Sequence, residues 1–288
     1  MAILPETPRW LVNQERDQEA LLVLSFIYSS CCEKQIADSY HILRERHLAE
    51  HVPHPVEKLF APINRRPVLL ALALQLFQQA TGNSALVYYS SLVIHRMGFR
   101  ARDALLFNAL AALPQLLVLV IVVFSLDRIG RRPALFFSEL GIVASLILMG
   151  IAMTVVDLKR QFWLLLAGIV LHRVFFAAGM GPVPSVLVAE ILPYSVRSQG
   201  LALALTVNWL ANFLVTASFP LLLDHVEPAW VYGGFASASL LGVGFIAVGI
   251  SETKGMALDP PSNPVADLEA SQSPPVSIRT PEPKLLFR

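Results

Sequence analysis

VLLALALQLFQQATGNSALVYYSSLVI, residues 68–94, is a stretch without a single Asp, Glu, Lys or Arg. A bilayer core of about 30 Å needs roughly 20 apolar residues in helical form, so this stretch is long enough to cross it. The chain of 288 residues is 55% hydrophobic and only 15% charged, which is too apolar for an ordinary soluble domain. We therefore predict an all-α membrane protein.

Five more stretches of similar length follow along the chain. Three of them lack Asp, Glu, Lys and Arg altogether, whereas 133–156 carries Glu139 and 161–189 carries His172 and Arg173. The connectors between the stretches are short, as between neighbouring antiparallel helices. We predict a six-helix transmembrane bundle over residues 68–251, with spans at 68–94, 104–126, 133–156, 161–189, 198–223 and 229–251.

The segments on either side of the bundle differ from it in composition. Residues 16–46 combine both charge signs with apolar residues at helical spacing, so we predict that residues 1–67 form a helical domain with amphipathic helices. Residues 252–288 are rich in Pro and Ser without periodicity, which predicts a disordered tail. With six spans, 16 of the 22 Lys and Arg residues fall on the side of the termini, so both termini are predicted to be cytoplasmic.

Composition and motifs argue against several functions. The formal net charge of +1 gives no basic excess for nucleic acid, and the only two cysteines, Cys31 and Cys32, lack the spacing of a zinc site. The sequence contains no set of acid, base and nucleophile and no Gly-rich phosphate loop. We therefore predict neither an enzyme nor a bound cofactor or metal.

Polar residues inside the first span form one stripe. A helix brings residues three and four apart onto the same face, and the stripe is flanked by Thr81 and Ser84. Such residues either join helices by hydrogen bonds or line a polar cavity. Because several amide side chains exceed what helix packing needs, we favour a cavity lined by Gln75, Gln78, Gln79, Gly82 and Asn83.

The fifth span repeats this pattern. Asn208 and Asn212 are one turn apart on the same face, and Trp209 lies next to Asn208. An amide both donates and accepts hydrogen bonds at neutral charge, which suits a ligand rich in hydroxyls, and Trp can stack on a sugar ring. Gln115, just after Pro114 in the second span, is either a further contact or a packing hydrogen bond.

The fourth span contains residues that interrupt a helix. Gly179, Gly181, Pro182 and Pro184 are expected to break or kink it, as in helices that line a transport cavity. His172 and Arg173 lie in the same span. Arg173 is either functional, or paired with a carboxylate, or close to the outer interface.

Charged residues mark two predicted cytoplasmic connectors. The string DRIGRRP, residues 127–133, places three guanidinium groups at one corner, and Glu190 and Arg197 lie at the ends of the other. Bidentate Arg/carboxylate pairs could lock the corners together. Such a lock serves either as a gate or as an anchor of the topology.

The motifs, taken together, resemble the sugar porters of the major facilitator superfamily, which include the facilitative hexose transporters. The matching strings are PETPRW (5–10), QQATG (78–82) with YYS (88–90), DRIGRR (127–132), GMGPVP (179–184), Glu190 with Arg197, NWLANF (208–213) and ETKG (252–255). The resemblance covers about residues 5–258. It implies the cytoplasmic helical domain and the second six-helix half of a twelve-helix transporter, expected in the plasma membrane.

The resemblance also assigns roles to residues. It implies that Gln78, Gln79, Gln115, Asn208 and Asn212 bind sugar hydroxyls. Ser84 takes the position of an asparagine in many glucose carriers, and Asn83 is turned about 100° from it around the helix. The resemblance implies helix breaks at Gly82, Pro182 and Pro184. It also implies cytoplasmic salt bridges among Arg128, Arg131, Arg132, Glu190 and Arg197, with Glu6 and Arg9 nearby.

Departures from the family pattern bear on the substrate. Ser185 replaces a glucose-contacting Trp, Ala177 replaces a Glu before the glycines, and Ser251 replaces a Pro. The loss of the Trp is more like the fructose-accepting subclass. The expected function is facilitative transport of a hexose, of glucose or fructose type, by alternating access. The alternative is a truncated, non-transporting partner that associates with an N-terminal half or a full-length carrier.

Overall fold

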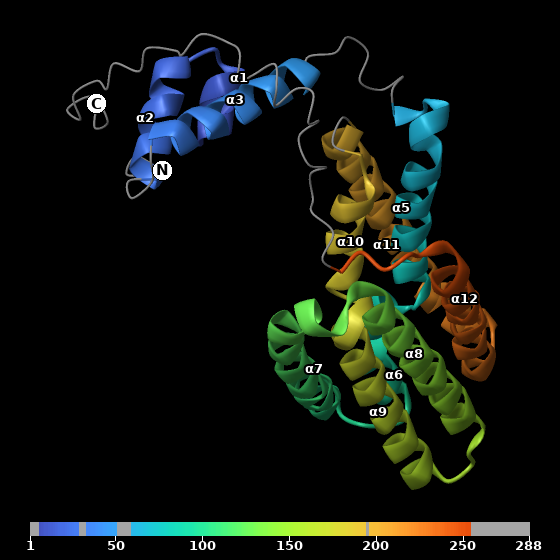
Figure 1. Ribbon diagram of the computed structural model, residues 1–288. Helices are drawn as coiled ribbons and strands as arrows, with labels where there is room; N and C mark the ends of the chain where they lie inside the picture. Colours follow the sequence, from blue (N-terminus) through green and yellow to red (C-terminus); the bar gives the residue numbers. More distant parts are fainter. Residues whose placement is uncertain (1–5, 29–32, 51–58, 194–195, 255–288) are drawn as a thin grey trace. The chain divides into compact units, whose positions relative to one another are not determined.

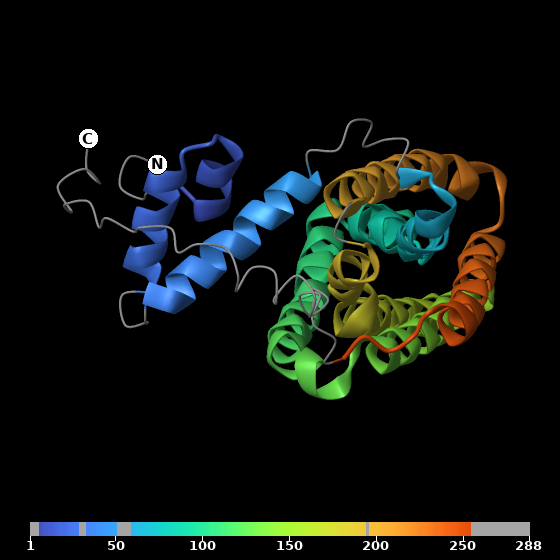
Figure 2. The same cartoon turned by 45° about the horizontal axis from the view of Figure 1, so that its top comes forward.

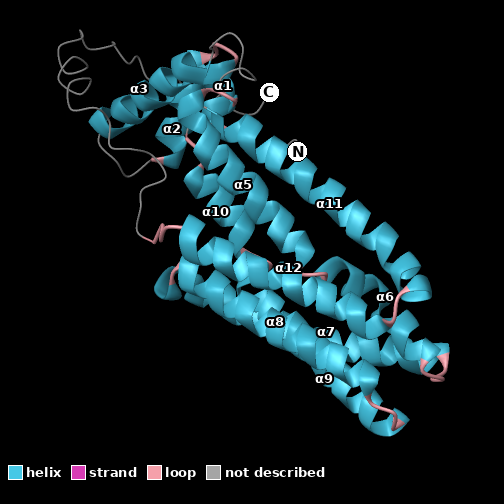
Figure 3. Ribbon diagram, turned by 90° about the vertical axis from the view of Figure 1, so that its right-hand side faces the viewer, coloured by secondary structure: helices cyan, strands magenta, loops and turns pink. Residues whose placement is uncertain are grey.

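The computed structural model describes residues 6–28, 33–50, 59–193 and 196–254. Two compact units make up the chain: Met1–Pro55 with Asp259–Arg288, and Val56–Leu258. All regular structure in the described residues is helical, and Figure 3 accordingly shows helices and loops without a strand. The prediction of an all-α protein is confirmed.

In its described residues, the first unit contains three helices that enclose a small core. These are α1 (Pro8–Asn13), α2 (Asp17–Ile27) and α3 (Glu33–Glu50), within the segment predicted to form the helical domain. The Thr7 hydroxyl caps α1 by accepting a hydrogen bond from the Trp10 N–H at 3.3 Å, as N-cap residues do. The core consists of one apolar face from each helix: Leu11, Val12, Ala20, Val23, Leu24 and Tyr40.

The second unit holds the predicted membrane bundle. Its helices are α5 (Pro62–Ala80), α6 (Asn83–Arg96), α7 (Ala101–Ile129), α8 (Arg131–Thr154), α9 (Leu158–Phe175), the π-helix η1 (Phe176–Met180), α10 (Val183–Ile191), α11 (Arg197–His225) and α12 (Pro228–Gly249). Among the described residues, five helical segments are long and apolar enough to cross a membrane: 101–126, 131–154, 158–191, 197–225 and 228–249. The sixth predicted span is shared between α5 and α6.

The helices of the second unit pack around one apolar core. Helix α8 packs against α9 and α12, α11 against α5 and α6, and α7 against α9 and α6 (Figures 1 and 2). The most deeply buried side chains include Leu74, Ile142, Leu146 and Ile169. By contrast, only 11% of the apolar stretches of α7 and α11 is buried inside the bundle. Their outer faces are therefore available to lipid or to another helix bundle.

The first predicted span is interrupted at its polar stripe. The predicted span 68–94 consists of two helices, because α5 ends at Ala80 and α6 begins at Asn83, on either side of Gly82, which the resemblance implies as a helix break. Between them, Gly82 adopts a left-handed φ of 72°, a conformation that favours glycine. Phe235 leaves little room here, since a Cβ built on Gly82 would lie 3.0 Å from its ring. The break therefore needs glycine for both conformation and space.

The fourth predicted span also changes its helical type at the glycines and prolines. Helix α9 passes into the π-helix η1, and the Gly181 N–H donates to the Phe176 carbonyl five residues back at 2.7 Å. Gly179 allows η1 to approach α8, because a Cβ built there would lie 2.3 Å from the Ala134 carbonyl oxygen. Pro182 is the N-cap of α10, so the helix restarts immediately after the π turn.

The residues after α12 differ from the predicted disordered tail at its first positions. Thr253 is buried, and Glu252 and Lys254 make hydrogen bonds to α7, α8 and the turn between them. Residues 252–254, at the start of the predicted tail, are thus hydrogen-bonded to the bundle. Residues 255–288 lie outside the described part of the chain.

We expect Gly179→Ala to destabilise the bundle, because the new methyl group would overlap the backbone of α8. Overpacking of this kind costs about 1–3 kcal/mol. The matched control is Gly244→Ala on α12, where a built Cβ meets nothing within 4 Å. Thermal unfolding in detergent should show a lower midpoint for Gly179→Ala and an unchanged or higher one for Gly244→Ala. Equal midpoints would contradict the close approach at Gly179.

Candidate functional site

An amide network joins α5 to α11. The Asn208 Nδ2 group donates to Gln75 Oε1 at 2.7 Å and to Gln78 Oε1 at 2.8 Å. Gln79 Nε2 in turn donates to Asn208 Oδ1 at 3.1 Å. Gln78 and Gln79 follow Gln75 by three and four residues, about one helical turn, so a single Asn on the neighbouring helix reaches all three. The predicted stripe on the first span and the predicted asparagine of the fifth therefore meet.

Ser84 extends the network across the helix break. Its hydroxyl donates to Gln79 Oε1 at 2.9 Å and accepts from Asn212 Nδ2 at 2.6 Å. Asn212 Nδ2 also lies 3.4 Å from Gln79 Oε1. Because Gly82 turns the chain between α5 and α6, the first turn of α6 points Ser84 back toward the amides. The network thus includes Gln75, Gln78, Gln79, Ser84, Asn208 and Asn212, which we call the amide network below.

Gln78 connects the amide network to the break in the fourth span. Pro184 has no N–H, so the carbonyl of Met180 lacks the donor that an α-helix would place four residues on. The Gln78 Nε2 group donates to this carbonyl at 2.8 Å and to that of Gly181 at 3.0 Å. A side chain of α5 thereby satisfies the carbonyl that Pro184 leaves free and the neighbouring carbonyl of Gly181.

Three other predicted or neighbouring residues lie outside the amide network. Asn83 Oδ1 is buried without a hydrogen-bond partner, and the Asn83 N–H bonds locally to Thr81 Oγ1 at 3.3 Å. Gln115 is half-buried in α7, and its side chain has no hydrogen-bond partner among the described residues. Trp209 projects from α11 with 66% of its surface exposed. The structure therefore does not bring Asn83, Gln115 or Trp209 into the network.

The amide network is neutral, and its groups bond to one another. Gln75 and Gln79 are buried, whereas Gln78, Asn208 and Asn212 remain partly exposed. Each amide offers both donors and acceptors, so a ligand hydroxyl can replace an amide partner without leaving a group unsatisfied. The described residues contain no group of three His, Cys, Asp or Glu side chains that could hold a metal ion. This arrangement suits exchange of hydrogen bonds with a polyhydroxylated molecule.

Arg173 and His172 lie near the end of α9 and connect this helix to α6, to α7 and to the end of α5. The Arg173 guanidinium donates to the Asn108 carbonyl at 3.0 Å and to Asn108 Oδ1, and lies 3.4 Å from Ser90 Oγ. Ser90 Oγ donates to Asn108 Oδ1 at 2.7 Å. His172 Nε2 lies 3.0 Å from the Thr81 carbonyl at the end of α5, and a carbonyl only accepts, so this nitrogen carries the hydrogen. The partners of Arg173 are thus polar and uncharged.

An ion pair between Arg131 and Glu190, two of the residues predicted to form salt bridges, lies at the corner between α7 and α8. Arg131 Nη2 is 3.2 Å from Glu190 Oε1, and both side chains are only 14% exposed. Thr253 Oγ1 donates to the other Glu190 oxygen at 2.5 Å. A pair this shielded from water is worth more than an exposed one, provided its remaining atoms are bonded. Glu190 therefore links α10 to the start of α8 and to the residues after α12.

The other predicted gating residues make backbone contacts. The Arg132 guanidinium donates to the Ala247 carbonyl at 2.7 Å, and Arg197 Nε donates to the Leu192 carbonyl at 3.3 Å. The Arg128 carbonyl accepts from Lys254 Nζ at 2.6 Å. Glu6 and Arg9 belong to the first unit, so their pairing with this corner stays a prediction.

Glu252 caps α8, a role that the predicted site residues did not include. Its carboxylate accepts from the N–H groups of Arg131 at 3.0 Å and Arg132 at 3.2 Å, which are free at a helix start. Gly130 makes room for it, since a Cβ there would lie 2.8 Å from Glu252 Oε2. Burial raises the pKa of Glu252, but the N–H donors of Arg131, Lys254, Arg132 and Thr253 outweigh it and hold the pKa below its usual value.

The second unit is thus a helical bundle with two broken spans and a neutral amide network between them, an arrangement found in transporter folds. The profile of the family described as "Sugar (and other) transporter" matches residues 1–260, so the chain belongs to that family. The resemblance to the sugar porters is thereby confirmed, and the chain is not an enzyme.

Named relatives cover most of this chain. A facilitated trehalose transporter Tret1 of Aedes aegypti is 28% identical over 268 residues, which are 90% of this chain and 33% of the relative. The major myo-inositol transporter IolT of Bacillus subtilis (strain 168) is 30% identical over 265 residues, 90% of this chain and 55% of the relative. The chain therefore spans between a third and about half of the length of these relatives.

Solved structures of the same superfamily share the fold. The proton:xylose symporter XylE bound to 6-bromo-6-deoxy-D-glucose superposes with a TM-score of 0.73 at 24% identity, over 88% of this chain and 53% of the symporter. An inward-open conformation of XylE from E. coli gives a TM-score of 0.61 at 23% identity, over 93% of this chain and 52% of that chain. These likenesses establish a major facilitator fold for the helices described above.

We expect Asn108→Leu to destabilise the protein strongly, because it leaves the buried Arg173 guanidinium without its amide acceptor. Leaving a buried donor without its acceptor costs about 1–3 kcal/mol, and more when the donor is charged. The double variant Asn108→Leu/Arg173→Met should recover most of that loss, since both groups are then apolar. Thermal unfolding in detergent measures this. A single variant as stable as the parent would show that the contact contributes little.

We expect the corner at Glu252 to weaken in acid. Because the folded-state pKa is lowered, the stabilisation is complete above the usual value of 4.5 and is lost as the pH falls through the lower, folded pKa. Glu252→Gln should therefore flatten the decline of the unfolding midpoint between about pH 5 and pH 3. Asp224→Asn, in an exposed pair with Arg96, is the control and should keep the parent's decline.

Proposed function

We propose that this chain is the substrate-binding half of a carrier that moves a neutral sugar across a membrane without chemical change. The observation that carries the proposal is the amide network between α5 and α11, with its hydrogen bonds to the freed carbonyls of Met180 and Gly181. Buried, uncharged groups that both donate and accept match the hydroxyls of a sugar. Gln78, Gln79, Ser84, Asn208 and Asn212 are the proposed contacts, with Gln75 added to them.

The proposed substrate is a hexose of glucose or fructose type. Its ring carries enough hydroxyls to replace several of the bonds that the amides now make to each other. Named relatives transport trehalose and myo-inositol, and a solved neighbour transports xylose, so the shared chemistry is the polyhydroxylated ring. Ser185 on α10 replaces the glucose-contacting Trp of the family pattern, which favours the fructose type. Asn83 and Gln115 remain proposed contacts that would need a rearrangement of α6 or α7.

The proposed transport is uniport. Every hydrogen-bond partner in the amide network is an amide, a hydroxyl or a backbone carbonyl, and none is a carboxylate. A neutral site offers no titratable group that could carry a proton together with the sugar. The breaks at Gly82 and at Pro182 and Pro184 divide α5–α6 and α9–α10 beside the network, where a bend can open one side.

We further propose that the corner of Arg128, Arg131, Arg132, Glu190 and Arg197 holds the cytoplasmic side closed, with Glu6 and Arg9 nearby. The shielded pair of Arg131 and Glu190 supports a lock that must break when α10 moves away from α8. Both termini are proposed to be cytoplasmic, and the membrane is proposed to be the plasma membrane. An N-terminal half or a full-length carrier is the proposed partner in transport.

A second candidate function is a membrane partner that does not transport by itself. The outer faces of α7 and α11 are largely unburied, which supports association with another bundle. Co-purification with a full-length sugar porter separates the two functions. Association without any change in sugar binding favours the partner function.

We expect the purified chain in detergent to bind radiolabelled D-fructose or D-glucose and not the L-enantiomer. Asn208→Ala should weaken binding by at least about tenfold, because it removes the residue that three glutamines contact. Gln79→Ala should weaken it similarly. Equilibrium binding at a series of sugar concentrations measures both.

Gln161→Ala is the matched control, since Gln161 lies at the start of α9 away from the network and its side-chain amide donates to Met153 Sδ at 4.0 Å. It should bind sugar like the parent. If a folded parent chain binds no sugar, alone or with an N-terminal half, the proposed carrier function fails. If Asn208→Ala binds sugar like the parent, the amide network is not its site.

A further inference from the structure

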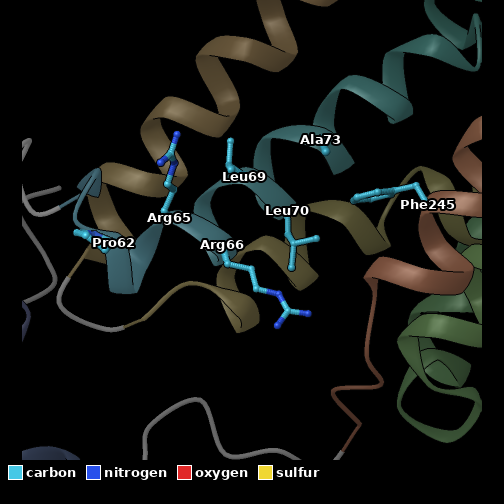
Figure 4. Close-up of a pocket in the computed structure, with 7 residues that line it drawn as sticks. All are labelled: Pro62, Arg65, Arg66, Leu69, Leu70, Ala73 and Phe245. Atoms are coloured by element: carbon cyan, nitrogen blue, oxygen red, sulfur yellow. The ribbon is translucent and has the colours of Figure 1, made fainter.

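A groove lies between the first half of α5 and the end of α12, away from the amide network. It has a volume of about 460 Å³ and is lined by Pro62, Arg65, Arg66, Leu69, Leu70, Ala73 and Phe245. The two arginines and Pro62 lie at one end, and Ala73 and Phe245 at the other (Figure 4). One end of the groove is therefore cationic, and the rest is apolar.

The walls of the groove are fixed by packing. Phe245 stacks on Phe77 with ring centroids 5.0 Å apart. At Gly249, α12 approaches α5 so closely that an added Cβ would lie 3.4 Å from Leu70 Cδ2. Leu69 remains 55% exposed along the open side. The groove is thus a built feature of the α5–α12 contact with a side open to its surroundings.

The cationic end has no counter-charge. The guanidinium group of neither Arg65 nor Arg66 has a hydrogen bond or ion pair with any residue in the described part of the chain. The first turn of α5 contains no acidic residue, and positive charge near a helix start is unfavourable because the helix dipole is positive there. Both side chains are exposed, and their stems line the groove. An anion at this end would stabilise both guanidinium groups.

The position of the groove along the helix matches the depth profile of a bilayer. Arg65 and Arg66 come just before Val68, where the predicted span begins, so they lie at the level of lipid headgroups. From Arg66 to Ala73 the helix rises roughly 10 Å, about a third of a hydrocarbon core. The apolar part of the groove therefore lies at the depth of the part of the acyl chain that is next to the headgroup.

We propose that this groove binds an anionic glycerophospholipid, with its phosphate at Arg65 and Arg66 and its acyl chain along Leu69, Leu70, Ala73 and Phe245. Charge complementarity selects an anionic headgroup, because a zwitterionic lipid brings its own cation to the same place. Arginine suits the phosphate because its guanidinium can bind two oxygens at once. The proposal concerns a site separate from the amide network and does not depend on sugar transport.

The test uses the full chain purified in detergent and titrated with phosphatidylglycerol or with phosphatidylcholine of the same acyl chains. Native mass spectrometry counts the bound lipid and gives its dissociation constant. We expect one phosphatidylglycerol to bind at least about tenfold more tightly than phosphatidylcholine. The double variant Arg65→Gln/Arg66→Gln should lose about 30-fold in affinity for phosphatidylglycerol, which corresponds to two basic residues next to an anionic lipid.

Matched variants separate charge from folding. Arg100→Gln/Arg102→Gln removes two exposed arginines at the start of α7 and should leave lipid binding unchanged. Arg65→Lys/Arg66→Lys should keep most of the preference for phosphatidylglycerol. Ala73→Phe should weaken both lipids by filling the apolar end. An unfolding midpoint equal to that of the parent confirms that each variant is folded.

Three results would overturn the proposal. The first is equal affinity of the parent and the Arg65→Gln/Arg66→Gln variant for phosphatidylglycerol. The second is equally tight binding of glycerol phosphate or inorganic phosphate, which would make the site one for a free anion. The third is a dimer of the chain that excludes lipid and is lost in the same double variant, which would make the groove an interface between copies.

Discussion

Every polar group that a membrane-spanning segment frees has to find a partner inside the protein, because the bilayer core offers no water. This constraint explains the placement of Gln78 and Ser138 in the second unit. Gln78 serves the carbonyls of Met180 and Gly181, which lose their helical partners where the prolines interrupt the fourth span. Ser138 donates to the Phe175 carbonyl and accepts from the Met180 N–H at the same π turn. The breaks in the helices and the side chains that repair them are therefore one structural unit.

The amide network satisfies the same constraint, and it is also the proposed sugar-binding site. The glutamines and asparagines satisfy each other, so in the proposed function a sugar would displace bonds of similar strength rather than fill an empty site. Binding is then an exchange with a small net gain, which suits a carrier that must release its cargo on the other side. Because Ser84 on α6 shares bonds with Gln79 and Asn212, such an exchange also alters how α6 is held across the Gly82 break.

The sequence predicts which residues form the site better than it predicts which of them contact each other. The charge-free stretches predict the helices, and the three- and four-residue spacing of amides predicts that one stripe on α5 faces α11. Spacing within one span gives no partner in another, so the contacts of Arg173 with Asn108 and Ser90 could not be predicted; a carboxylate was the considered alternative. The capping role of Glu252 was missed because composition assigned it to the tail, although it stands in a recognised family string. Asn83 was assigned from the spacing of the stripe and Gln115 from the family resemblance, and neither makes a hydrogen bond to the network among the described residues.

The π-helix Phe176–Met180 has a consequence for chain length. A π turn holds one residue more than an α turn, and each residue of a helix adds about 100° of rotation. The face that α10 turns toward α5 and α8, and with it the direction of Glu190, therefore depends on that one extra residue. Deleting a single residue between 176 and 180 would rotate everything from Pro184 to Glu190 out of register without changing any side chain. In this segment, insertions and deletions are consequently under tighter constraint than substitutions.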